Sequence, residues 1–241
     1  MSYYGSSQIS FGPQLSPGIK KLMIIMGVIF LVQGVVRKID YMLVYQIGGL
    51  RPYYVWHKLQ IWRLVTYMFL HGGLAHILFN FLALWMFGSE LEYSWGTPFF
   101  LKYFFITGIG AGICTALVAP NSRIPTIGVS GAVYGLLLAF ALTYPDRTIL
   151  LLIPPIPIKA KYFAMIFGFI EFYSTVSHSS DGIAHIAHLG GMLIGYIYLN
   201  YPTIMKKIKK RRSQKRYRVY GKGFEFDDDD NDDDFTRRTF H

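Results

Sequence analysis

The sequence predicts an all-α, polytopic membrane protein in which six helices cross a bilayer. Composition is the first reason: of the 241 residues, 52% are hydrophobic and only 16% are charged, whereas soluble domains carry about 25% charged residues. The mean hydropathy is positive, at +0.32. The second reason is order along the chain, because apolar runs alternate with short polar or proline-containing breaks. Together these features argue against an ordinary soluble domain.

The net charge of +10 indicates membrane orientation, not nucleic-acid binding. Half of the 24 Lys and Arg residues lie in residues 203–241. Because positive residues stay on the cytoplasmic side of a membrane, we expect both termini to be cytoplasmic. The protein is then a multi-pass protein of the cell (plasma or inner) membrane. Cys114 is the single cysteine of the sequence, which excludes an intramolecular disulfide and a cysteine-based zinc site.

Three regions are expected along the chain. Residues 1–17 form a polar lead-in rich in Gly, Ser and Pro, and residues 18–202 form the membrane domain. Residues 203–241 form a cytoplasmic tail that is first basic and then acidic, a pattern typical of disordered segments.

The first span is expected at residues 22–36, after Lys20 and Lys21. No small-x-small cleavage site follows it, so a retained span is favoured over a secretory signal. Residues 37–63 are aromatic and basic, which suits a large loop at the headgroup level. The other spans are expected at residues 64–87, 98–118, 128–142, 162–176 and 182–199.

Residues 148–158 are apolar but contain three prolines. Proline removes a helical hydrogen bond and clashes with the preceding turn. We therefore expect a short hairpin or a re-entrant connection in place of a helix.

Polar residues in these apolar spans fall at one depth. With cytoplasmic termini, the second, fourth and sixth spans each begin on the outer side of the membrane. Their outer halves carry the polar residues His71, His76, Asn80, Ser130, His185 and His188.

Ser130 opens the fourth span within the sequence GVSGAVYG, residues 128–135. The first N–H groups of a helix lack internal partners and carry partial positive charge, so they can bind an oxyanion. Gly128 permits a tight entry and a close approach of substrate. A serine in a membrane helix is usually structural, so a catalytic role requires partners.

Glycine spacing predicts how the fourth and sixth spans meet. Gly131 and Gly135 are four residues apart, while His188, Gly191 and Gly195 share one helix face. Small residues let membrane helices approach closely. We expect these two glycine faces to pack against each other.

This packing would bring His188 next to Ser130, as the base that a serine hydroxyl needs. Tyr134 would lie one turn deeper and stack on the imidazole. His185 is a rival for the same role, one turn nearer the outside.

His76 and Asn80 lie four residues apart on the second span. They would share one helix face and donate to the same oxyanion from the opposite side.

We expect no bound metal and no cofactor. The four intramembrane histidines offer imidazoles, but the H-E-x-x-H pattern is absent, and the acidic residue nearest that depth is Asp181, near the surface. The histidines could also form a proton path, as in a small transporter.

The motifs occur in a recognisable order over about residues 50–200. They are Trp62-Arg63, HGGLAHILFN (71–80) continuing to Gly88 and Glu92, GVSGAVYG (128–135) and AHLGGMLIG (187–195). In this combination the chain resembles the rhomboid intramembrane serine proteases.

The resemblance implies a six-helix bundle with Ser130 as nucleophile and His188 as general base, in a dyad without an aspartate. It implies an oxyanion hole made by His76, Asn80 and the N–H of Ser130. Tyr134 would support His188. Arg63 and Glu92 would be structural.

The function so implied is a serine endopeptidase that cleaves transmembrane segments near their outer end. Its partners would be transmembrane substrates and the lipid bilayer, with no nucleic acid, and the oligomeric state is left open. The alternative is a catalytically inactive relative that binds client helices.

Overall fold

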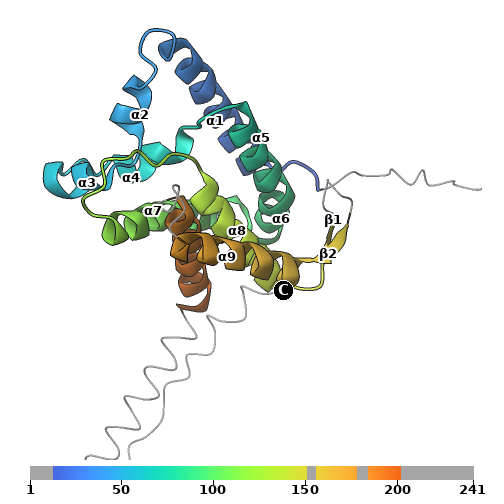
Figure 1. The fold of residues 1–241 in the computed structure, drawn as a ribbon. Helices are drawn as coiled ribbons and strands as arrows, with labels where there is room; N and C mark the ends of the chain where they lie inside the picture. The colour runs from blue at the N-terminus through green and yellow to red at the C-terminus, as the bar shows by residue number, and fades with distance from the viewer. Residues whose placement is uncertain (1–12, 151–155, 178–183, 202–241) are drawn as a thin grey trace, which may run out of the picture. The chain divides into compact units, whose positions relative to one another are not determined.

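Helices make up most of the chain that the computed structural model describes, which is residues 13–150, 156–177 and 184–201. The elements are α1 (Pro17–Val36), α2 (Leu43–Gly48), α3 (Pro52–Lys58), α4 (Arg63–Thr66), the 3-10 turn η1 (Tyr67–Phe69), α5 (Leu74–Ala83), the π-helical η2 (Leu84–Gly88), α6 (Ser89–Trp95), α7 (Thr97–Val118), α8 (Ser130–Thr143), β1 (Thr148–Leu150), β2 (Pro157–Lys159), α9 (Ala160–Val176) and a last helix over residues 184–201 (Figure 1). The predicted all-α class is confirmed.

Three helical runs are long and apolar enough to cross a membrane: Pro17–Val36, Leu74–Trp95 and Thr97–Val118. Ser130–Thr143 is apolar but shorter. Helices α9 and 184–201 occupy the positions expected for the last two spans. The count of six spans remains a prediction.

The second long helix begins later than expected. It was predicted over residues 64–87, but α5, η2 and α6 form one continuous run over Leu74–Trp95. Gly72 and Gly73 explain the difference, because the conformational freedom of glycine disfavours helix; Gly73 is fully extended, at φ −179°. His71 therefore lies in the connection before α5, not on the helix.

The proline-rich segment forms the predicted hairpin, in which β1 pairs antiparallel with β2 and Thr148 lies opposite Lys159. At its base Asp146 accepts hydrogen bonds from Lys161 (2.8 Å) and Lys159 (3.1 Å). These two bonds lower the pKa of the Asp146 carboxyl. Residues 151–155, at the tip, lie outside the described residues.

The loop expected at residues 37–63 contains α2 and α3 and is fixed by the buried side chain of Arg63. Its guanidinium donates to the carbonyls of Gln46 and Gly49, both at 2.7 Å, and to Oε1 of Gln60 at 2.6 Å. Three acceptors satisfy a charge that is only 4% exposed. This arrangement is what a structural role for Arg63 requires.

Glu92 on α6 anchors the start of α1. Its carboxylate accepts hydrogen bonds from the Ser16 hydroxyl (2.5 Å), the N–H groups of Gly18 (2.7 Å) and Ile19 (2.9 Å), and the Thr97 hydroxyl (2.6 Å). The N–H groups of a first helical turn lack internal partners and favour a negative charge. Residues 1–12 of the predicted lead-in and the whole tail, 203–241, lie outside the described residues.

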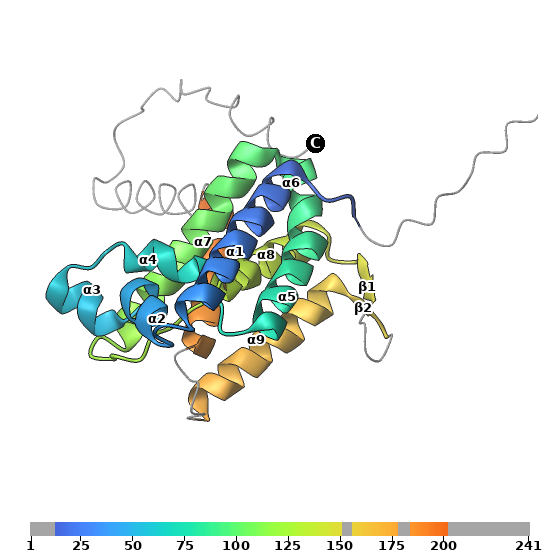
Figure 2. The ribbon, with the colours of Figure 1, turned by 90° about the horizontal axis from the view of Figure 1, so that it is seen from above.

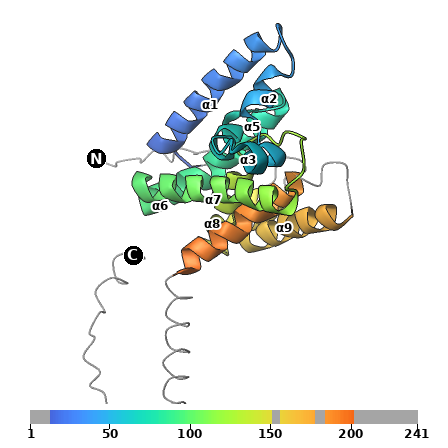
Figure 3. The ribbon, with the colours of Figure 1, turned by 90° about the vertical axis from the view of Figure 1, so that its left-hand side faces the viewer.

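Helix α8 lies in the interior of the membrane domain, in contact with α5, η2, α7 and α9 (Figure 2). In Figure 3, α6 and α7 lie between α1 on one side and α9 on the other. Large apolar side chains point outward from both flanking helices; Leu31 on α1 and Phe169 on α9 are 71% and 66% exposed. Such faces suit contact with lipid.

We expect Glu92→Ala to lower the free energy of unfolding by about 3 kcal/mol, because buried N–H and hydroxyl donors lose their acceptor. Thermal unfolding in detergent measures the change. The matched control is Glu90→Ala, which breaks a more exposed ion pair with Arg147 and should cost less than about 1 kcal/mol. Equal stability of the two variants would contradict the anchoring role.

Candidate active site

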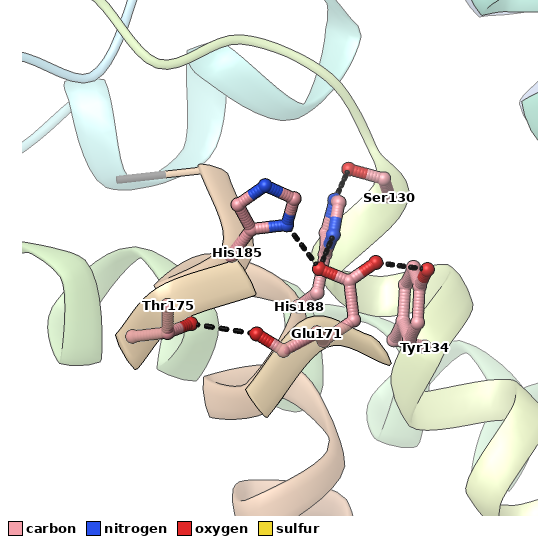
Figure 4. Close-up of polar contacts among 6 residues, drawn as sticks. All are labelled: Ser130, Tyr134, Glu171, Thr175, His185 and His188. Carbon is pink, nitrogen blue, oxygen red and sulfur yellow. Dashed lines mark hydrogen bonds and ion pairs between the residues drawn. The ribbon is translucent and has the colours of Figure 1, made fainter. Parts of the chain in front are cut away.

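Ser130 and His188 lie within hydrogen-bond distance of each other. Ser130 is the first residue of α8 and His188 lies on the helix of residues 184–201, yet Ser130 Oγ is 2.7 Å from His188 Nε2 (Figure 4). Because Ser130 begins α8, the N–H groups of the first turn, which lack helical partners, lie at the site.

The two helices can approach this closely because glycine faces glycine at their crossing. A Cβ on Gly191 would lie 1.9 Å from the carbonyl oxygen of Gly131. A Cβ on Gly131 would lie 2.6 Å from Cβ of Ala111 on α7. Side chains are therefore excluded from this point, and the backbones touch.

The next glycine on each of the two helices lies against α7. A Cβ on Gly195 would lie 2.3 Å from the Tyr103 hydroxyl, and one on Gly135 would lie 2.7 Å from Cβ of Thr107. Both side chains belong to α7, and the Tyr103 hydroxyl also donates to the carbonyl of Gly135 at 2.8 Å. The two glycine faces were expected to pack against each other; at Gly135 and Gly195 the nearest neighbours are side chains of α7.

Tyr134 stacks on His188, with ring centroids 4.3 Å apart and planes 11° from parallel. Ser130 and Tyr134 are four residues apart on α8, and they contact one imidazole, Ser130 at its Nε2 edge and Tyr134 on its face. The stack limits rotation of the His188 ring.

His76 faces the entry of α8. Gly128 has φ +114°, and a Cβ there would lie 2.7 Å from His76 Nε2, so glycine is needed both for conformation and for space. The Gly72 N–H donates to His76 Nδ1 at 3.3 Å. A neutral imidazole that accepts at one nitrogen donates from the other, so Nε2 is a donor next to Ser130.

Asn80 is buried one turn further along α5, and its amide donates to the carbonyl of His76 at 3.0 Å. An amide nitrogen carries two hydrogens, so one remains for another acceptor. His71 packs edge-on against His76, with centroids 5.1 Å apart.

Glu171 on α9 is the site residue that the sequence analysis missed. Its Oε1 accepts a hydrogen bond from the Tyr134 hydroxyl. Its Oε2 lies 2.5 Å from His185 Nδ1 and 3.0 Å from His188 Nδ1 (Figure 4). The signal was present: Glu171 is the only acidic residue of the expected fifth span, residues 162–176, and ionisable residues inside membrane spans usually have a function.

The contacts of Glu171 with the two histidines also bear on metal binding. The ligand atoms of Glu171, His185 and His188 lie within 4.8 Å of one another, an arrangement that could hold a cation. Metal binding was not expected because Asp181 was the acidic residue predicted nearest the histidines; Glu171 contacts two of these histidines, so that reason does not hold. Asp181 lies outside the described residues.

Comparison with known proteins decides the family. Residues 58–202 match the Rhomboid domain family. The chain belongs to the rhomboid family. It is therefore an integral membrane protein, of the all-α class that its sequence predicts.

Named relatives come from bacteria and from organelles. The chain is 30% identical to the mitochondrial rhomboid protein 1 of Saccharomyces cerevisiae over 71% of its own length and 49% of the relative. It is 32% identical to the chloroplastic rhomboid-like protein 11 of Arabidopsis thaliana, over 64% of its own length and 57% of the relative. It is 31% identical to the rhomboid protease GlpG of Yersinia pestis, over 63% of its own length and 52% of the relative. The chain thus spans about half the length of these relatives.

We expect Gly191→Ala to lower the free energy of unfolding by about 1–3 kcal/mol, because the methyl group forces the helix of residues 184–201 away from α8. Thermal unfolding in detergent tests this. Gly27→Ala on α1 is the matched control: its Cβ meets nothing within 4 Å, so stability should stay unchanged or rise by up to about 1 kcal/mol. Indistinguishable variants would contradict the close crossing.

Proposed function

We propose that the protein is an intramembrane serine endopeptidase that uses Ser130 as nucleophile and His188 as general base. The observation that carries the proposal is the 2.7 Å approach of Ser130 Oγ to His188 Nε2. A serine hydroxyl needs such a base to become nucleophilic. Membership of a family with named proteases supports the same function.

In this mechanism the Ser130 hydroxyl attacks the scissile carbonyl while His188 takes its proton. The tetrahedral intermediate collapses to an acyl-enzyme as His188 returns the proton to the leaving amine. Water then hydrolyses the ester by the same proton transfers in reverse order. The N–H of Ser130 at the start of α8, Nε2 of His76 and the amide of Asn80 would stabilise the oxyanion.

The assignment of the base favours His188 over His185. His188 directs Nε2 toward Ser130 and carries the Tyr134 ring on its face. His185 directs Nδ1 toward Glu171 at 2.5 Å. Of the two imidazoles, His188 has the contact that a base for Ser130 needs.

The substrate class follows from the setting of the site. We propose that the protein cleaves transmembrane segments of membrane proteins, close to their outer end. Both termini of the protease would lie in the cytoplasm. A formed helix buries its carbonyls in hydrogen bonds, so cleavage requires a substrate segment that unwinds there.

We expect Ser130→Ala and His188→Ala to abolish cleavage of a single-span reporter in liposomes, while both variants still insert and unfold like the wild type. Losing the nucleophile removes the chemistry, and losing the base costs at least about 100-fold. Product formation on gels measures both. Full activity of His188→Ala would contradict the dyad and make His185 the next candidate for the base.

The alternative is a catalytically inactive member that binds client helices. It predicts that Ser130→Ala and the wild type capture the reporter equally and that neither yields product. Cleavage by the wild type alone decides for the protease. A small transporter using the histidines predicts proton flux into liposomes, which the protease does not.

We expect cleavage to survive dialysis against EDTA or 1,10-phenanthroline, because the proposed chemistry needs only a serine and an imidazole. Activity after metal removal is compared with activity after added Zn²⁺. A loss that Zn²⁺ restores would contradict the proposal and assign a metal to Glu171, His185 and His188.

A further inference from the structure

The contacts of Glu171 lead to an inference that rests on the proposed function and extends it. We propose that Glu171 is a positioning residue for His188, so that the catalytic unit is a Ser130–His188–Glu171 triad. This differs from the dyad without an acidic member that the family resemblance implies.

The three residues lie in the order that a triad requires. One nitrogen of His188, Nε2, lies 2.7 Å from Ser130 Oγ, and the other, Nδ1, lies 3.0 Å from Glu171 Oε2. A base that takes the Ser130 proton on Nε2 must carry its own hydrogen on Nδ1. A carboxylate beside Nδ1 fixes that tautomer and stabilises the imidazolium that forms during attack.

His188 Nδ1 has no other partner in the described part of the chain. The atom is buried, and no hydrogen bond of regular geometry reaches it there. A buried N–H without an acceptor is costly. A small shift of the Glu171 carboxylate, already at ion-pair distance, supplies the acceptor.

The carboxylate is itself held from two sides. Tyr134 on α8 donates to Oε1, and His185 on the helix of residues 184–201 contacts Oε2 (Figure 4). Tyr134 also stacks on His188, so one residue restrains both the imidazole and its carboxylate. This gives His185 a place in the site through Glu171.

A comparison with the other buried charges separates Glu171 from a purely structural group. Arg63 and Glu92 each bind two main-chain groups, carbonyls for Arg63 and N–H groups for Glu92, and so hold segments of main chain. Among the described residues, the polar contacts of the Glu171 carboxylate are with side chains, those of His188 and its neighbours Tyr134 and His185. A carboxylate that is 5% exposed within a membrane domain is expensive to keep.

The test is steady-state kinetics of Glu171→Gln, Glu171→Asp and Ser130→Ala in liposomes with the single-span reporter. We expect Glu171→Gln to lower kcat by about 100-fold or more with KM changed less than about threefold, because orientation of the base matters in the transition state. Glu171→Asp keeps the charge and should recover at least about tenfold of that loss. The matched control Glu90→Gln should keep wild-type kinetics.

Each outcome is decisive. A kcat for Glu171→Gln within about twofold of wild type, with Ser130→Ala inactive, overturns the triad and leaves the proposed protease intact. Activity in Ser130→Ala overturns the proposed function itself. If Glu171→Gln does not fold, Glu171→Asp decides: a several-fold lower kcat at constant KM supports the triad, and unchanged kinetics overturn it.

Discussion

The backbone contact between Gly131 and Gly191 sets the geometry of everything around Ser130. Side chains cannot enter this crossing, because a Cβ on Gly191 would lie 1.9 Å from the carbonyl oxygen of Gly131. Ser130 precedes one glycine, and His188 lies three residues before the other, on the same helix face. A hydroxyl and an imidazole that are 58 residues apart in the chain therefore meet at 2.7 Å.

Around this contact, polar side chains gather inside an apolar domain. His76 lies against Gly128 at the entry of α8, and Tyr134 and Glu171 surround the far side of His188. Electrostatic interactions are stronger in such low-dielectric surroundings than in water. In the proposed mechanism, donors and a base that are fixed in this way would act without reorganising.

The sequence predicted the close approach of Ser130 and His188 and the stacking of Tyr134, because glycine spacing and helical period fix which residues share a face. It also predicted the helical class, the large loop at residues 37–63 and the hairpin at the prolines. These features depend on local patterns: hydropathy, breaks and i, i+4 spacing.

What the sequence did not predict depends on a third helix. Gly135 and Gly195 pack on Tyr103 and Thr107, and pairwise reasoning about two helices cannot foresee that α7 lies beside both. Glu171 carried a signal as the one acidic residue of an apolar span, but its partners lie on α8 and on the helix of residues 184–201, and reasoning about two helices does not bring them together.

The later start of the second long helix is different, because Gly72-Gly73 is a local signal. Hydropathy alone does not register it: the apolar run begins at Leu64, before the break.

The most direct measurement of the central claim is mass-spectrometric mapping of the adduct formed with a fluorophosphonate probe. Such probes react with serines that a neighbouring base activates. The account predicts one adduct on Ser130 in the wild-type protein and none in His188→Ala at equal probe concentration. An unmodified Ser130 in folded wild-type protein, or equal labelling of Ser130 in His188→Ala, would contradict it.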